Sequence, residues 1–344
     1  MIKYKTLIIG NNLEKNQLGS MLVRASQAME LPLAVSDTSW DSYAPSMKHS
    51  WGKIFFRIAK KRPLEWWSFN RKTIETIKET TPKLVIVTGI FPIKNEIFDI
   101  CNRMGIKIVN YLTDSPSSKQ NAHPIFRKNL LRYDIIFSTK KDIIPDLNSW
   151  GAMHVCFLPF GFDPYIHRCL STKEFEQDES LQNDACFIGG ADADRKNFIN
   201  DFLPHFKGKL GLYGDYWYQD RNLKQFDYGF VYGDAFCKTI QSCKINLGLV
   251  RRKNSDGHSM RSYEIPACGG VGVYEDTPEH RDLFYGYPEY GFFSSPQDLA
   301  AKCNWLLEHP EEREQMRQLG IQLIVKESNT YEARLREILE SVNK

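Results

Sequence analysis

The sequence predicts an α/β protein with two doubly wound parallel sheets, and three observations lead to this fold class. Short apolar segments of four to six residues alternate with longer stretches of helical periodicity. The polar, acidic segment 171–183 interrupts the alternation once, as a linker would, and the pattern then resumes. The length of 344 residues is about that of two domains. Strands that helices cover on both faces are apolar throughout, as these segments are.

The first half contains six predicted strands, at residues 6–10, 33–36, 84–88, 107–111, 135–138 and 154–158. Helices are predicted between them where apolar residues share one helical face, as Ile74 and Ile77 do in the segment 70–80. The other helices predicted in this half are 18–29 and 95–104. Strand, helix and strand in repetition favour parallel pairing, because parallel strands need a crossover connection.

The second half repeats this pattern after the linker. Its predicted strands are 185–188, 210–213, 245–249 and 271–274, and its predicted helices are 196–205, 233–242 and 259–267. The remainder is helical. Ser295 followed by Pro296 is a typical helix start, a second helix starts at Pro310, and a third is predicted over 331–342.

Composition and charge exclude several classes of protein. The 45 Lys and Arg nearly balance the 42 Asp and Glu, which argues against a nucleic-acid binder that depends on bulk charge. No run of 18 apolar residues exists, and the apolar segment near Met1 is too short for a signal peptide. The eight cysteines form no CxxC pair, which predicts reduced thiols rather than a zinc site. We therefore expect a cytoplasmic protein.

Ligands of open parallel sheets bind beyond the carboxyl ends of the strands, so the loops there are the candidate sites. The first such loop holds Gly10, Asn11 and Asn12, without the GxGxxG spacing of a nicotinamide-binding fingerprint. Small residues at a helix start admit an anion or a sugar. A turn that simply needs glycine is the alternative.

A second glycine-containing loop opens the second domain. Gly190 follows a predicted strand, and Arg195 and Lys196 lie at the start of the next helix. Backbone N–H groups and the helix dipole favour phosphate there, and either cation can supply charge. Because cations are otherwise disfavoured in a first turn, we interpret this loop as a phosphate site. An ordinary solvated helix start is the alternative.

The stretch 244–270 is the richest in candidate residues. A strand leads into a basic loop, and the following helix carries Arg261 and Glu264 three residues apart, on one face. Apolar residues follow Glu264, so its carboxylate is expected in a packed environment that suits two ribose hydroxyls. An ordinary helical ion pair is the alternative.

These segments, taken in order, resemble the group 1 glycosyltransferases of the GT-B superfamily, and most closely their CgeB-like (spore maturation protein) branch. RSYEIPACGGVGVYE at 261–275 is similar to the nucleotide-sugar site of the superfamily. LPFGFDP at 158–164 is similar to its interdomain crossover, and YLTDSP at 111–116 to a loop of the first domain. FFSSPQDL at 292–299 and HPEER at 309–313 are similar to the late helices. The resemblance covers residues 110–344 well and the first 100 loosely.

The resemblance implies a GT-B fold in which two Rossmann-like domains face an interdomain cleft. The acceptor domain would be 1–165, the nucleotide-sugar domain 166–327, and a helix in 328–344 would pack back on the first domain. The implied activity is retaining transfer of a sugar from a nucleoside diphosphate sugar to a glycan, a lipid-linked precursor or a protein, with no further cofactor. The implied donor-binding residues are Gly190, Arg195, Lys196, Tyr213, Gly214, Arg261 and Glu264.

Two further residues are candidates for catalysis. The superfamily often has a second glutamate before the one that matches Glu264, but here that position is Gly257, so we predict that the neighbouring His258 contacts the donor sugar or phosphate. Asp114 follows a first-domain strand and is predicted to orient or deprotonate an acceptor hydroxyl. An Asx turn before Pro116 is the alternative for Asp114, and a purely structural histidine is the alternative for His258.

We predict no metal ion, because cations and helix N-termini can stabilise a diphosphate leaving group. The only DxD triplet, at 192–194, lies outside the expected metal position. The basic and aromatic segment 48–72 could contact an anionic membrane, at its inner face, or an acceptor. A helix whose aromatic residues face the core is the alternative, and nucleic-acid binding is not predicted. A non-catalytic nucleotide-sugar-binding protein and an inverting transferase or epimerase stay alternative functions.

Overall fold

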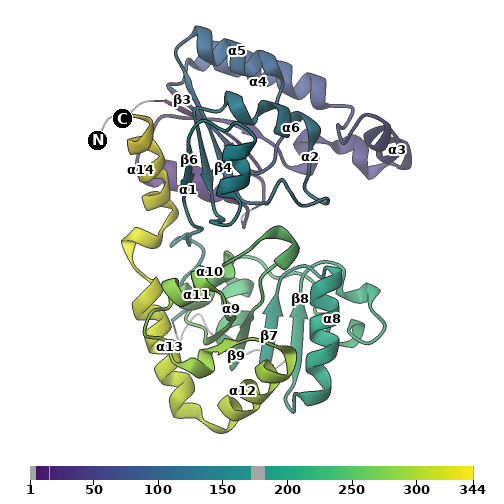
Figure 1. Cartoon of the computed structure of the whole chain (residues 1–344), viewed down its shortest axis with the longest axis vertical. Coiled ribbons are helices and arrows are strands. Elements are labelled where there is room, and N and C mark those ends of the chain that lie inside the picture. The colour runs from purple at the N-terminus through teal and green to yellow at the C-terminus, as the bar shows by residue number, and fades with distance from the viewer. Residues whose placement is uncertain (1–4, 15, 172–182, 344) are drawn as a thin grey trace. The chain divides into compact units, whose positions relative to one another are not determined.

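The computed structural model describes residues 5–14, 16–171 and 183–343, which form two compact units (Figure 1). Unit 1 comprises Met1–Pro159, Lys253–Ser255 and Tyr331–Lys344, and unit 2 comprises Phe160–Arg252 and Asp256–Thr330. Each unit has its own hydrophobic core. The domain bounds predicted from the sequence fall at 165 and 327. Most of the predicted linker 171–183 lies outside the described residues.

Unit 1 contains a parallel sheet with strand order β2-β1-β3-β4-β5-β6. The strands are β1 (Thr6–Gly10), β2 (Leu33–Asp37), β3 (Leu84–Thr88), β4 (Lys107–Leu112), β5 (Ile135–Ser138) and β6 (Val155–Phe157). All six predicted strands are confirmed. The central strands are apolar because helices cover both faces of the sheet, and Val85, Ile86 and Val87 of β3 are fully buried.

The helices of unit 1 are α1 (Leu18–Ala28), α2 (Trp40–Tyr43), α3 (Ser50–Ile58), α4 (Trp66–Thr80), α5 (Asn95–Arg103), α6 (Pro124–Asn129), α7 (Ile144–Ser149) and α14 (Tyr331–Val342). α4 begins four residues before its predicted start, because Trp66 and Phe69 pack into the core. The Trp66 indole also donates a hydrogen bond to the Pro92 carbonyl. α14 packs against α1.

Unit 2 contains a second parallel sheet, with order β11-β10-β9-β7-β8. Its strands are β7 (Ala185–Ile188), β8 (Leu210–Tyr213), β9 (Ile245–Gly248), β10 (Gly272–Glu275) and β11 (Phe292–Phe293). The four predicted strands are confirmed. The assignment of Phe292–Phe293 to a late-helix motif is wrong, because these two residues pair with Tyr274 and Glu275 at the sheet edge.

The helices of unit 2 are α8 (Ala193–Phe202), α9 (Asp234–Ser242), α10 (Arg261–Ala267), α11 (Pro278–Leu283), α12 (Pro296–Glu308) and α13 (Pro310–Ile324). The Ser295 hydroxyl caps α12 by accepting from the Asp298 N–H, as the sequence predicts. α8 begins three residues before its predicted start, because the Asp192 carboxylate caps it. Arg195 and Lys196 therefore lie inside the first turn.

Short 3₁₀ segments connect these elements. They are η1 (Pro45–Lys48), η2 (Leu130–Arg132), η4 (Leu203–His205), η5 (Trp217–Gln219), η6 (Lys224–Phe226), η7 (Arg252–Asn254), η8 (Glu289–Gly291) and η9 (Glu327–Asn329). Within the described part of the chain, no helix is long and apolar enough to span a bilayer.

Candidate functional site

Two glycine-containing loops meet at the carboxyl edge of the unit 2 sheet. The loop after β7 and the loop after β8 are joined by a hydrogen bond of 2.7 Å from the Gly189 N–H to the Tyr213 carbonyl. Gly214 has φ +132°, and a Cβ there would lie 2.7 Å from the Gly189 carbonyl oxygen. Only glycine fits such an approach without strain. The structure thus brings together Gly190, Tyr213 and Gly214, all predicted to bind the donor.

The side chain of Trp217 packs against the first of these two loops. Its side chain is fully buried, and its indole Nε1–H donates a hydrogen bond of 2.9 Å to the Gly189 carbonyl. Its ring packs edge-on against Phe187 of β7. The role of Trp217 was not predictable, because nothing near it in the sequence shows that its partner is 28 residues away.

Arg261 and Glu264 form an ion pair on α10, which is the arrangement that the sequence left open as the alternative to a ribose contact. The Arg261 guanidinium reaches the end of β7, where its Nε–H donates a hydrogen bond of 2.8 Å to the Ile188 carbonyl. It lies over the Phe236 ring, and the side chain is 25% exposed. Arg261 therefore presents a cation beside the glycine loop while its partner lies deeper.

Glu264 is fully buried, and this bears on its predicted ribose contact. One carboxylate oxygen pairs with Arg261, and the other lies 3.4 Å from His167 Nε2. His167 Nδ1 accepts the Asp163 N–H at 3.1 Å, so Nε2 carries the hydrogen that faces Glu264. In this structure Glu264 holds Arg261 in place and exposes no oxygen to solvent. The ribose contact stays a prediction.

Arg195 has a different environment from the one its sequence position suggests. Its guanidinium is buried over the Phe187 ring and donates hydrogen bonds to the carbonyls of Gly190, at 3.1 Å, and Leu249, at 3.2 Å. Burial lowers its pKa to about 10, so it stays charged at neutral pH. These contacts make Arg195 a brace between two loops. The other predicted cation, Lys196, is half-buried at the start of α8.

Arg251 is a cation of this edge that is not among the predicted donor-binding residues. Its side chain is 47% exposed, and its Nε lies 3.7 Å from an Asp192 carboxylate oxygen. Its guanidinium would lie 3.9 Å from a Cβ placed on Gly190. The strand order explains the position of Arg251. Because β9 lies beside β7, the first basic residue after β9 lies next to the glycine loop after β7.

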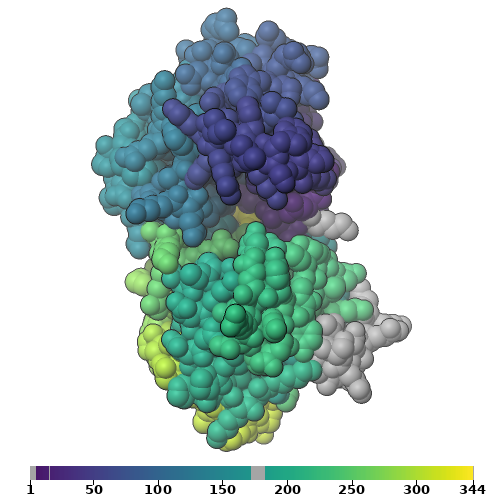
Figure 2. All heavy atoms as spheres, turned by 90° about the vertical axis from the view of Figure 1, so that its right-hand side faces the viewer, coloured from purple at the N-terminus to yellow at the C-terminus, as the bar shows by residue number. Residues whose placement is uncertain are grey.

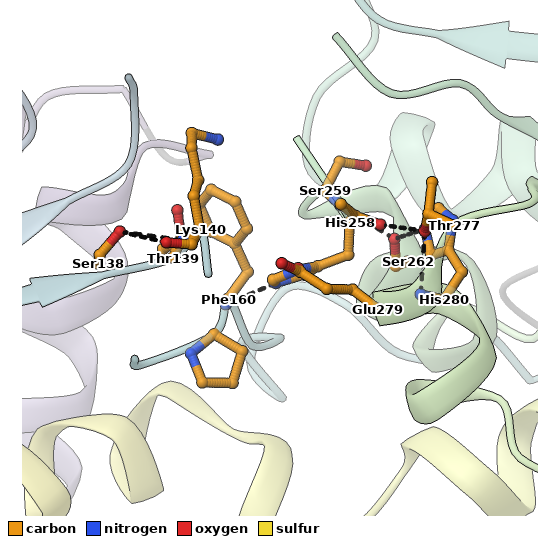
Figure 3. A network of polar contacts seen from close by, with 12 residues as sticks. Ser138, Thr139, Lys140, Phe160, His258, Ser259, Ser262, Thr277, Glu279 and His280 are labelled. Carbon is orange, nitrogen blue, oxygen red and sulfur yellow. Dashed lines mark hydrogen bonds and ion pairs between the residues drawn. The ribbon is translucent and has the colours of Figure 1, made fainter. Parts of the chain in front are cut away.

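His258 is buried within a polar network between the loop before α10 and the start of α11 (Figure 3). Its Nε2 accepts the Phe160 N–H at 3.3 Å, so Nδ1 carries the hydrogen and donates it to the Glu279 carboxylate. A side chain on Gly257 would collide with Glu279. Both ring nitrogens of His258 are therefore engaged within the protein. The predicted donor contact would require His258 to leave these partners.

His280 completes this network and stays neutral. Its Nδ1–H donates a hydrogen bond of 2.7 Å to the Glu275 carbonyl, and its Nε2 accepts the Ser262 hydroxyl at 2.8 Å (Figure 3). Burial lowers its pKa to about 4. The hydroxyl of Thr277 caps α11 and donates to the Gly257 carbonyl. Together these bonds fix the basic loop against α11.

In unit 1 the side chain of Asp114 lies in a hydrogen-bonded cluster. One carboxylate oxygen accepts from Asn254 Nδ2 at 3.0 Å and the other from the Thr113 hydroxyl at 3.0 Å. The buried Asn254 also accepts the Ser115 N–H at 2.8 Å. Asp114 is half-buried, and its role toward an acceptor stays a prediction.

The loop of Gly10, Asn11 and Asn12 has the features of a tight turn. A Cβ on Gly10 would lie 2.6 Å from the Thr88 hydroxyl, so the turn itself requires glycine. The Asn12 side chain donates to the Gly10 carbonyl, and its backbone N–H donates to Asp37. Binding of an anion or a sugar at this loop stays a prediction. Among the residues that the structure describes, no three His, Cys, Asp or Glu side chains cluster as metal ligands would.

Comparison with known proteins agrees with this architecture. Residues 195–340 match the family model described as Glycosyl transferase-like. HepE of Anabaena, solved with UDP and glucose, is 12% identical with a TM-score of 0.66, and the match covers 99% of each chain. The search of curated proteins found no match. The chain has the GT-B fold.

Two further GT-B structures show how widely this fold is shared. An alpha-glucosyltransferase in complex with UDP and DNA is 12% identical, with a TM-score of 0.64 over all of both chains. The beta-glucosyltransferase of phage T4 is 13% identical, with a TM-score of 0.58 over 98% of each. At these identities the likeness shows the fold alone. The predicted CgeB-like branch and the predicted interdomain cleft stay predictions.

Proposed function

We propose that this protein is a glycosyltransferase that takes a sugar from a nucleoside diphosphate sugar. The observation that carries the proposal is the edge of unit 2, where the glycine loops after β7 and β8 pack together and Arg251 and Arg261 present charge beside Gly190. Part of this edge lies inside the region that matches the Glycosyl transferase-like family. UDP is the nucleotide bound by HepE and by the alpha-glucosyltransferase, so a UDP-sugar is the donor we favour.

The chemistry of the reaction fits these residues. Breaking the bond between a sugar and a diphosphate leaves negative charge on the departing oxygens, and fixed cations stabilise that charge. Arg261 is held by Glu264, so little reorganisation is needed when the charge develops. The N-terminus of α8 adds a favourable dipole. These groups act without a metal ion or a further cofactor, as we propose for this protein.

The stereochemistry and the acceptor belong to the same proposal. We favour retention, which the resemblance of the sequence implies, with a glycan, a lipid-linked precursor or a protein as acceptor. Asp114 would orient the acceptor hydroxyl. An inverting transferase is the alternative, since an alpha- and a beta-transferase both have this fold. Nuclear magnetic resonance of the anomeric proton in the product distinguishes them.

Calorimetric titration with UDP, GDP and ADP tests the donor site. We expect UDP to bind, and Arg251→Gln and Arg261→Gln each to weaken it about tenfold or more, because each removes a charge-assisted hydrogen bond. Lys207→Gln is the matched control, since Lys207 is exposed before β8, at the opposite edge of the sheet, and should leave affinity unchanged. Failure of all three nucleotides to bind would refute the donor site.

Donor hydrolysis separates an enzyme from a non-catalytic nucleotide-sugar-binding protein. A transferase releases nucleoside diphosphate slowly from its donor into water, whereas a binding protein returns the donor intact. Arg251→Gln should slow the release, and the thermal transition of the variant shows whether it is folded. Conversion of the sugar without release of nucleotide would instead indicate an epimerase.

A further inference from the structure

Helix α3 presents apolar side chains to solvent, which a helix of this composition normally buries. Trp51 is 55% exposed, Ile54 58% and Ile58 78%, and the helix buries only Gly52. The spacing of three and four residues places the exposed side chains on one face. Figure 2 faces this part of unit 1, and the dark violet-blue atoms of the segment lie on its surface. The sequence left open whether the aromatic residues of 48–72 face the core, and the structure divides them. Trp51 and Trp67 are exposed, whereas Trp66 and Phe69 are buried.

The opposite side of α3 fixes this orientation. A Cβ on Gly52 would lie 2.0 Å from the Ser46 carbonyl oxygen, so the helix backbone packs directly on η1. Ser46 is held in turn by Glu65, which accepts its N–H at 2.8 Å and its hydroxyl at 2.7 Å. The exposed face is thus a built feature of unit 1. α3 lies at the margin of the unit, away from the sheet (Figure 1).

Two aromatic residues extend the apolar face of α3. Trp67, at the start of α4, is 41% exposed, and its ring lies 6.3 Å from that of Phe55. Trp40 is exposed beside Phe56. We name Trp51, Ile54, Ile58 and Trp67 the α3 patch. Tryptophan is enriched where proteins meet the boundary between lipid and water, because its ring is apolar and its N–H polar.

The charge around the α3 patch is strongly positive. Residues 48–72 contain eight Lys and Arg, and Glu65 is their only acidic residue. Its carboxylate is already bound to Ser46. Lys53, Arg57 and Lys60 are exposed and form no salt bridge with any residue in the described ranges. The apolar face is therefore bordered by cations that have no internal counter-charge.

We propose that the α3 patch docks on the anionic surface of a lipid bilayer. An amphipathic helix with a Trp and Ile face and a Lys and Arg border lies in the lipid interface, with its apolar side chains among the upper acyl chains. Each cation near such a surface adds to the attraction. A second copy of the chain is a poorer occupant, because pairing would bring two positive surfaces together. Nucleic acid would leave the central isoleucines without an apolar contact.

Co-sedimentation of the full chain with vesicles tests this proposal. We use phosphatidylcholine alone and a 7:3 mixture of phosphatidylcholine with phosphatidylglycerol. We expect binding to the mixed vesicles at low salt, at least tenfold weaker binding to the neutral ones, and weakening as salt is raised. Ile54→Ser with Ile58→Ser should reduce binding at least tenfold. The triple change of Lys53, Arg57 and Lys60 to Gln should also reduce vesicle binding at least tenfold.

Matched controls separate the α3 patch from general surface properties. Met153→Ser with Val325→Ser removes two exposed apolar side chains elsewhere, and Gln at Lys207, Lys224 and Lys326 removes three exposed cations of unit 2. Both controls should bind like the unmodified protein. The proposal is overturned if the unmodified protein does not sediment with mixed vesicles, if patch and control variants bind alike, or if the patch changes alter only self-association measured by ultracentrifugation.

The test is independent of the proposed function. UDP titration of the patch variants should give unchanged affinity, since they lie in unit 1 and leave the unit 2 edge intact. Loss of vesicle binding with UDP binding retained supports docking by itself. A protein that binds vesicles but no nucleotide would keep this proposal and refute the donor site.

Discussion

Lowering the pH from 8 to 5 should destabilise the protein through His280. In the folded state burial lowers its pKa to about 4, whereas the ordinary value is 6.5. Between these values the unfolded chain binds a proton that the folded chain does not, so stability falls as the pH drops below about 6.5. The difference in proton binding corresponds to about 2 kcal/mol at pH 5. For a unit of this size that is about 4–8 °C in melting temperature.

Thermal melts of the unmodified protein and of His280→Asn, at pH 8 and pH 5, measure this effect. Asn retains an N–H near the position of Nδ1 and so a donor to the Glu275 carbonyl, but it does not titrate. The variant should be less stable at pH 8 and should lose about 4–8 °C less between the two pH values. An equal loss in both proteins would show that His280 does not carry the pH dependence.

Two further changes test the packing of the candidate site by urea unfolding. Gly214→Ala should cost about 2–3 kcal/mol through strain and collision, whereas Gly229→Ala, also at positive φ but with open space around it, should cost about 1 kcal/mol. Equal costs would contradict a close approach at Gly214. Trp217→Phe should cost about 1 kcal/mol, because the half-buried Gly189 carbonyl loses its donor. A neutral result there would show that another donor replaces the indole.

The strands were predictable because burial on both faces leaves a mark in the sequence. The central residues of a strand such as Leu84–Thr88 are apolar at every position from Leu84 to Val87, and such a run is visible without knowing its neighbours. Phe292–Phe293 was not predictable, since two residues show no period and β11 exists only through its pairing with β10. The early start of α8 depends on one side-chain bond, from the Arg195 N–H to Asp192.

The location of the candidate site was predictable, but the exposure of its residues was not. Chain topology places the loops after parallel strands at one edge, and that rule brings Gly190 near Arg261. Arg195 is buried because its guanidinium reaches inward to the Leu249 carbonyl, and this acceptor lies 54 residues away in the sequence. His258 is buried in a hydrogen bond with Glu279, which lies 21 residues further along the chain. Local sequence does not reveal such partners, and it therefore does not distinguish a cation that faces ligand from one that braces a loop.

The membership of α14 in unit 1 has a consequence for synthesis of the protein. Its buried Leu335 and Ile338 belong to a helix that packs against α1, yet they leave the ribosome after all of unit 2. Unit 2 can fold from a nearly continuous segment of the chain while unit 1 still lacks helix α14. During that interval the surface of α1 stays uncovered, which is when chaperones and proteases compete for it. An early translational stop after Thr330 would make this temporary state permanent.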